Sequence, residues 1–136
     1  MQIQPYLSFE GRCDEAVQFY QSALGAEVQM IMRFKDAPDS GMTPPGSADK
    51  VMHTAIKIGD SIILATDGRC TGSPGFTGIS LSLDVADEAQ AEQKFAALAD
   101  GGKITMPLMK TFFAPKFGMV QDRFGIQWMI VVQHQP

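Results

Sequence analysis

The 136-residue sequence lacks the features that mark secreted and membrane proteins. None of its apolar runs approaches the roughly 20 residues of a transmembrane helix. The N-terminus, MQIQPYLSFEG, has no basic start followed by a long apolar stretch. We therefore expect a cytoplasmic protein that makes no contact with membranes. Cys13 and Cys70 stand far apart with no motif around them, so reduced thiols are expected, with one disulfide as the alternative.

Basic residues are also scarce. Eleven Lys and Arg face fifteen Asp and Glu, which gives a net charge of −4. This balance argues against nucleic-acid binding, because that needs cations to displace counterions from phosphates. There is no G-x-G-x-x-G sequence, no P-loop lysine and no glycine-rich turn typical of an S-adenosylmethionine site. With 45% apolar and 19% charged residues, the composition is that of a globular domain.

The first regular segment, residues 3–9, alternates between apolar and mixed positions. This pattern predicts a strand with Leu7 and Phe9 on the face toward a helix and Tyr6 on the opposite face. Pro5 has no N–H group, so the strand is expected at an edge of its sheet.

A helix should follow and end at Gly25 in a left-handed conformation, with Asp14 as its N-cap. The stretch 35–49 contains three prolines and two glycines and predicts a long loop, either a mobile surface loop or a lid or binding loop. Further strands are expected at 27–34, 50–58 and 61–66.

The same order of elements then repeats. A shift of 74 residues places Leu7 on Leu81, and a shift of 66 places the turn glycine Gly59 on Gly125. The repeat predicts one domain over 1–136, built from two modules joined by a linker. The modules are expected at about 1–67 and 78–134, with the linker at about 68–77. Module two should contain strands at 79–85, 103–106, 112–121 and 126–132 and a helix from 87 or 88 to 99.

Three stretches carry a family resemblance: PYLSFEGRCDEAVQFYQSALGAEV, MHTAIKIGDSIILATD and FGMVQDRFGIQWMIVV. They resemble PhnB-like proteins of the glyoxalase/bleomycin resistance/extradiol dioxygenase (vicinal oxygen chelate) superfamily. The resemblance implies an α+β fold of two tandem βαβββ modules, which form a cupped mixed β-sheet with the helices on the outside. It also implies a homodimer.

Metal-dependent members of that superfamily hold a divalent ion with four side chains, from the first and last strand of each module. The corresponding positions are Gln4, Gly78 or Ser80, Ile63 and Met129. Of these only Gln4 offers a suitable donor, since Ile63 has none and Met129 offers a soft thioether. We therefore expect no metal and no cofactor. The alternative is a divalent-metal-dependent lyase, isomerase or dioxygenase of the same superfamily.

The favoured interpretation is a protein of unknown specific activity that binds a small-molecule ligand in an apolar cleft, with no catalytic residue identified. Its candidate ligand-binding residues are Tyr6, His53, Phe113 and Trp128. His53 is either a ligand-binding or acid–base imidazole or a strand histidine hydrogen-bonded to a neighbour. The aromatic residues of the last third either line the cleft or form core and dimer contacts. Trp128 precedes Met129 on the same strand, so the two side chains point to opposite faces of the sheet. Trp128 can therefore face the helices and belong to the core.

Overall fold

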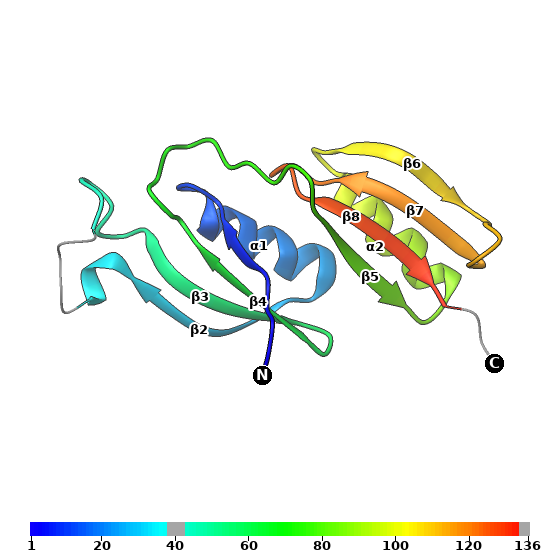
Figure 1. Cartoon of the computed structure of the whole chain (residues 1–136), viewed down its shortest axis with the longest axis horizontal. Helices are drawn as coiled ribbons and strands as arrows, with labels where there is room; N and C mark the ends of the chain where they lie inside the picture. Colours follow the sequence, from blue (N-terminus) through cyan, green and yellow to red (C-terminus); the bar gives the residue numbers. More distant parts are fainter. Residues whose placement is uncertain (38–42, 134–136) are drawn as a thin grey trace. The chain divides into compact units, whose positions relative to one another are not determined.

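The computed structural model describes residues 1–37 and 43–133, and the chain divides into two compact units, Met1–Pro74 and Gly75–Pro136 (Figure 1). We call them module one and module two. Module one contains β1 (Tyr6–Ser8), α1 (Cys13–Leu24), β2 (Glu27–Arg33), β3 (Val51–Ile58) and β4 (Ser61–Thr66). Module two contains β5 (Ser80–Val85), α2 (Glu88–Ala99), β6 (Lys103–Met109), β7 (Lys116–Gln121) and β8 (Gln127–Val132). The predicted α+β fold of two tandem βαβββ modules is confirmed.

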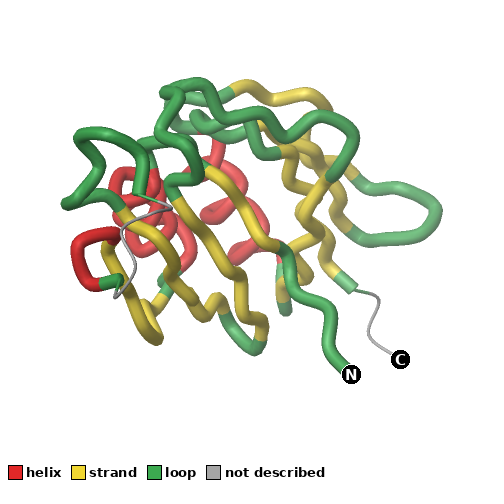
Figure 2. Tube along the Cα trace, turned by 60° about the vertical axis from the view of Figure 1, so that its left-hand side comes forward, coloured by secondary structure: helices red, strands yellow, loops and turns green. Residues whose placement is uncertain are grey.

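Each module forms a mixed four-stranded sheet, in the orders β1-β4-β3-β2 and β5-β8-β7-β6. The first strand of each module pairs in parallel with the last, and the remaining pairs are antiparallel. Strand β1 lies at an edge, as Pro5 predicts, and Pro5 contributes its carbonyl to Leu64 N at 2.9 Å. Residues 1–5 form an irregular segment before β1 (Figure 2).

The core of each module lies between the helix and its own sheet. Leu7 and Phe9 are 4% and 1% exposed, and they face the side on which Val17 and Tyr20 of α1 are buried. Gly25 ends α1 with φ of 69°, as predicted. In module two the buried residues of α2 are Ala91, Phe95 and Leu98. Within the described part of the chain, neither 12-residue helix is long enough to cross a membrane.

The prediction that Asp14 caps α1 is wrong. The helix begins at Cys13, the side chain of its N-cap residue Arg12 makes no capping hydrogen bond to the helix backbone, and Asp14 lies in the first turn. Cys13 N instead donates to Asp67 Oδ1 at 2.7 Å. The tertiary structure explains the difference. The segment after β4 places a buried carboxylate at the start of the helix, where it does the work of a local N-cap side chain.

The predicted equivalence of Gly59 and Gly125 is also wrong, because the two turns differ in length. In module one Ile58 pairs with Ser61, which leaves a two-residue hairpin turn. In module two Gln121 pairs with Gln127, which leaves a connection over 122–126. The fourth residue after each glycine therefore falls on a different face: Ile63 is buried in the core, whereas Met129 is half-buried, opposite the buried Trp128.

Several strand bounds differ from those expected. The first strand is shorter than the segment 3–9, and the predicted strand 112–121 begins only at Lys116. The strand predicted at 103–106 continues to Met109. Of the predicted long loop, residues 38–42 lie outside the described residues, and 34–36 form a short 3₁₀ helix.

Candidate functional site

A pocket of about 750 Å³ opens in module one, among strands β1, β3 and β4 and the segments that follow β2 and β4. Its size lies in the range of about 300–1,000 Å³ that is usual for small-molecule sites. Most of the side chains around it are apolar. We call it the module-one pocket, and its lining residues are Tyr6, Phe34, Thr43, Pro44, Pro45, Met52, Thr66, Gly68 and Arg69.

The sheet register brings the predicted residues Tyr6 and His53 together. Tyr6 pairs with Leu64, which pairs with Ala55, so the three side chains share one face. His53 lies two residues from Ala55 and therefore faces the same way. The His53 Nδ1 atom lies 3.3 Å from the Tyr6 hydroxyl, and the ring centroids are 5.6 Å apart. Tyr6 is 55% exposed and lines the pocket, whereas His53 is not among the lining residues and contacts the lining residue Tyr6.

A β-bulge explains why Met52 also reaches the pocket. Met32 pairs with His53 and Arg33 with Val51, so β3 contains one extra residue, Met52, at this point. A bulge interrupts the strict alternation of faces and redirects a side chain. The Thr66 hydroxyl donates to Met52 O at 2.7 Å and accepts a bond from Gly68 N, which holds the bulged backbone.

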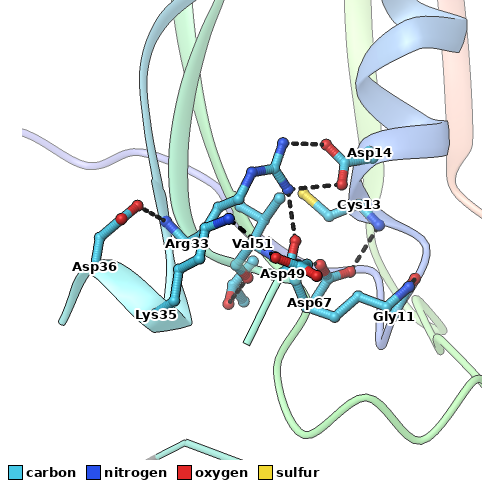
Figure 3. A network of polar contacts seen from close by, with 11 residues as sticks. Gly11, Cys13, Asp14, Arg33, Lys35, Asp36, Asp49, Val51 and Asp67 are labelled. Atoms are coloured by element: carbon cyan, nitrogen blue, oxygen red, sulfur yellow. Dashed lines mark hydrogen bonds and ion pairs between the residues drawn. The ribbon is translucent and has the colours of Figure 1, made fainter. Parts of the chain in front are cut away.

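A polar network fixes the chain on either side of the loop that follows β2 (Figure 3). The Arg33 guanidinium donates to both carboxylate oxygens of Asp14, at 2.9 and 3.1 Å, and to Asp49 O at 2.7 Å. Lys35 Nζ pairs with Asp49 Oδ1 at 3.0 Å. The hydrogen bond to Asp14 is the main cause that raises the pKa of Arg33. Single exposed pairs stabilise little, but these connect the end of β2, the start of α1 and the chain entering β3.

The pocket wall formed by residues 43–50 is ordered by its own turn. Ser47 is 2% exposed, and its hydroxyl donates to Pro44 O. Lys50 N donates to Ser47 O at 2.8 Å, and Phe34 N donates to Lys50 O at 3.1 Å. Pro44 and Pro45 line the pocket together with the buried Phe34, and the proline rings restrict their own backbone angles.

The opposite wall is held by Glu10. Its Oε2 atom accepts bonds from Arg69 N at 3.0 Å and Thr71 N at 3.2 Å, and its Oε1 atom accepts from Ser8 Oγ at 2.9 Å. Burial alone raises the pKa of Glu10, but the bonds from Thr71, Ser8 and Arg69 outweigh it and leave the pKa below its ordinary value. Gly68 has φ of +57°, and a Cβ atom there would displace the Ser8 and Glu10 side chains, so any other residue would be strained at this position.

The two predicted ligand-binding residues of module two have different environments. Trp128 is 3% exposed, and its Nε1 donates to Asp122 Oδ2 at 2.9 Å, which matches the alternative of a core residue. Phe113 is 47% exposed and lies in the connection before β7. Its ring makes edge contacts with Phe112 and Phe117, at centroid distances of 5.1 and 5.0 Å.

The donors of module one do not fit the metal site of the superfamily. The expectation that Ile63 occupies a ligand position is wrong, because Ile63 faces the core. Its neighbours Ile62 and Leu64, which face the other way, also lack a donor, so β4 supplies no metal ligand at or beside the expected position. Among residues 1–37 and 43–133, no group of three or more His, Cys, Asp and Glu is close enough to hold an ion.

Sequence reasoning did not identify Met52, Thr66 or Arg69 as site residues. Met52 depends on a bulge that no periodic pattern reveals, and Arg69 lies in a glycine-rich stretch that reads as a linker. The adjacent prolines 44 and 45 were the one available signal, since they marked the loop 35–49 as a possible binding loop.

Comparisons with known proteins support the fold and place the chain in a family. The family profile described as "3-demethylubiquinone-9 3-methyltransferase" matches residues 1–131. Protein YjdN of Escherichia coli (strain K12) is 37% identical, with 100% of this chain and 99% of the relative covered. The crystal structure of protein PA1353 from Pseudomonas aeruginosa is 39% identical, covers 99% of both chains and has a TM-score of 0.85.

A second solved structure carries the PhnB designation. It is titled a putative 3-demethylubiquinone-9 3-methyltransferase, PhnB protein, from Bacillus cereus. It is 29% identical, covers 97% of this chain and 99% of the other, and has a TM-score of 0.80. With its repeated βαβββ modules and a match over almost its full length, the chain belongs to the PhnB-like, 3-demethylubiquinone-9 3-methyltransferase family, and its fold is the one expected for the glyoxalase/bleomycin resistance/extradiol dioxygenase superfamily.

Proposed function

We propose that this protein binds a small molecule with an apolar body in the module-one pocket, and that binding does not use the superfamily's metal. The observation that carries the proposal is the pocket of about 750 Å³, with the Tyr6 hydroxyl at its edge and His53 against that hydroxyl. Apolar walls with a few placed polar groups are the usual composition of a ligand site.

The Tyr6–His53 pair supplies the orienting groups. Each side chain both donates and accepts hydrogen bonds, and the tautomer of His53 decides which of the two donates to the other. A polar group of the ligand at Tyr6 would therefore meet a hydroxyl whose proton is directed by the imidazole. Phe113 remains a predicted ligand contact, whereas the proposal does not use Trp128, because its indole is buried and bonded to Asp122.

Fluorescence titration with the uncharged apolar probe N-phenylnaphthylamine tests the proposal. Tyr6→Ala should weaken binding about tenfold, which corresponds to roughly 1.4 kcal/mol from lost contact area. His53→Ala should also weaken binding, because it removes the ring that contacts Tyr6. Dialysis of the wild-type protein against EDTA should leave the affinity unchanged. Phe112→Ala is the matched control, because Phe112 is 97% exposed and lies outside the pocket.

Three outcomes would contradict the proposal: no probe binding by the wild-type protein, unchanged binding by both pocket variants, or loss of binding after EDTA treatment. Thermal unfolding of each variant separates loss of binding from loss of fold. Tyr6 is half-exposed, so its removal should change the unfolding midpoint little.

We also propose that the protein is a homodimer. Strands β2 and β6 are the outer strands of their sheets, and each exposes apolar side chains. Such edges are normally covered by association.

A further inference from the structure

The module-one pocket contains a single formal charge, and it is positive. Of its nine lining residues, Arg69 is the only one that is ionised at neutral pH. The chain as a whole has a net charge of −4, so the charge at the pocket is opposite in sign to the net charge of the protein.

The Arg69 guanidinium is available to a ligand. The ion pairs of the described residues join Arg12 to Glu15, Arg33 to Asp14, Lys35 to Asp49 and Arg123 to Asp100, and none of them includes Arg69. The carboxylate of Glu10, which contacts this segment, accepts hydrogen bonds from the backbone N–H groups of Arg69 and Thr71 and from the Ser8 hydroxyl.

The backbone under Arg69 is fixed, which makes the position of the charge reproducible. Glu10 Oε2 accepts a bond from Arg69 N itself, and Gly68 before it allows the tight turn against Ser8. A cation on such an anchored segment loses less conformational freedom on binding than one on a free loop. The adjacent Thr66 hydroxyl donates its proton to Met52 O, so it cannot donate to a ligand at the same time.

We propose that the module-one pocket takes an organic anion, with one acidic group against Arg69 and an apolar body against Met52, Phe34 and the prolines. This inference rests on the proposed function and names the chemical class of its ligand. The planar guanidinium presents paired donors that match the oxygens of a carboxylate, sulfonate or phosphate group. Tyr6 and His53 then face a second polar group of the ligand.

A pair of fluorescent probes with the same aromatic body tests the proposal: anilinonaphthalene sulfonate, which is an anion, and N-phenylnaphthylamine, which is uncharged. The wild-type protein should bind the sulfonate about tenfold more tightly than the amine. Arg69→Gln should abolish this difference by weakening the sulfonate alone, and Arg69→Lys should retain most of it. Raising the salt concentration should weaken the sulfonate on the wild-type protein and much less on Arg69→Gln.

Arg123→Gln is the matched control, because it makes the same change of charge in module two, where Arg123 is bonded to Asp100. It should leave both affinities unchanged. If Arg69→Gln leaves sulfonate binding intact, or weakens both probes equally, the anion class is wrong while the pocket remains a binding site. If neither probe binds the wild-type protein, the proposed function fails together with this inference.

Discussion

Asp67 is a buried carboxylate that joins three parts of module one. It is 0% exposed, and it accepts bonds from Cys13 N at 2.7 Å and from Val51 N at 2.6 Å. Asp67, the residue directly after β4, therefore accepts hydrogen bonds from the first N–H of α1 and from the first N–H of β3 (Figure 3). Burial, followed by the charges of Asp67 and Asp14, raises the pKa of the Cys13 thiol and keeps it protonated. Cys13 is thus a core residue and not a nucleophile.

Replacing Asp67 with Asn should destabilise the protein by about 3 kcal/mol, because an amide has one acceptor oxygen and leaves a buried N–H facing its NH₂ group. Urea unfolding measures the change in the free energy of unfolding. Asp60→Asn is the control, since Asp60 is exposed in the β3–β4 turn, and it should change that free energy by less than about 0.5 kcal/mol. Equal effects of the two substitutions would show that the Asp67 bonds do not stabilise the fold.

In each module a buried or half-buried carboxylate stabilises the connections between elements, but the connections it stabilises differ. In module two Asp122 accepts bonds from Phe124 N and Ile126 N and from the indole of Trp128. It orders the β7–β8 connection, whereas Asp67 orders the start of a helix. In module one the connection after β4 is tied back to the end of β1 by Glu10, which has φ of 50°.

The Glu10 connection predicts a dependence of stability on pH. Its folded-state pKa lies below the ordinary value of 4.5, so its charge stabilises the fold above that pH, and this contribution is lost as the pH falls through the folded-state pKa. Glu10→Gln should cost about 1 kcal/mol at pH 7, and its difference from wild type should shrink below pH 4.5. Denaturant unfolding at several pH values, with the exposed Glu92→Gln as control, checks this. A difference that stays constant down to low pH would contradict it.

For the molecule as a whole, the exposed apolar edges favour association. Val28, Met30 and Ile31 of β2 are 38%, 40% and 42% exposed, and β6 likewise exposes Ile104 and Met106. Light scattering at micromolar concentration should therefore give about twice the 14.8 kDa mass of one chain. Ile31→Lys should shift the mass toward the monomer, and Gln93→Lys on α2 should not. A stable wild-type monomer would overturn the proposed homodimer.

The faces of the regular elements follow from local sequence. Leu7 and Phe9 were predicted from a period of two to face the helix, and both are buried. On α2 the buried residues Ala91, Phe95 and Leu98 are likewise spaced as one face of a helix requires. These periodicities are properties of the backbone itself, so they hold wherever the element lies. The family resemblance extended the prediction to the α+β fold with mixed sheets, which a period alone does not contain.

The sequence by itself thus determined the element order, the core faces and the pair of Tyr6 and His53 as candidates. Only the tertiary structure decided that Asp67 serves the start of α1, that a bulge turns Met52 to the pocket, and that Arg69 lines it. The reason is physical. A period fixes on which face of its own element a side chain lies, whereas a cap, a bulge or a pocket wall depends on chain segments far apart in sequence, such as Cys13 and Asp67, which are 54 residues apart.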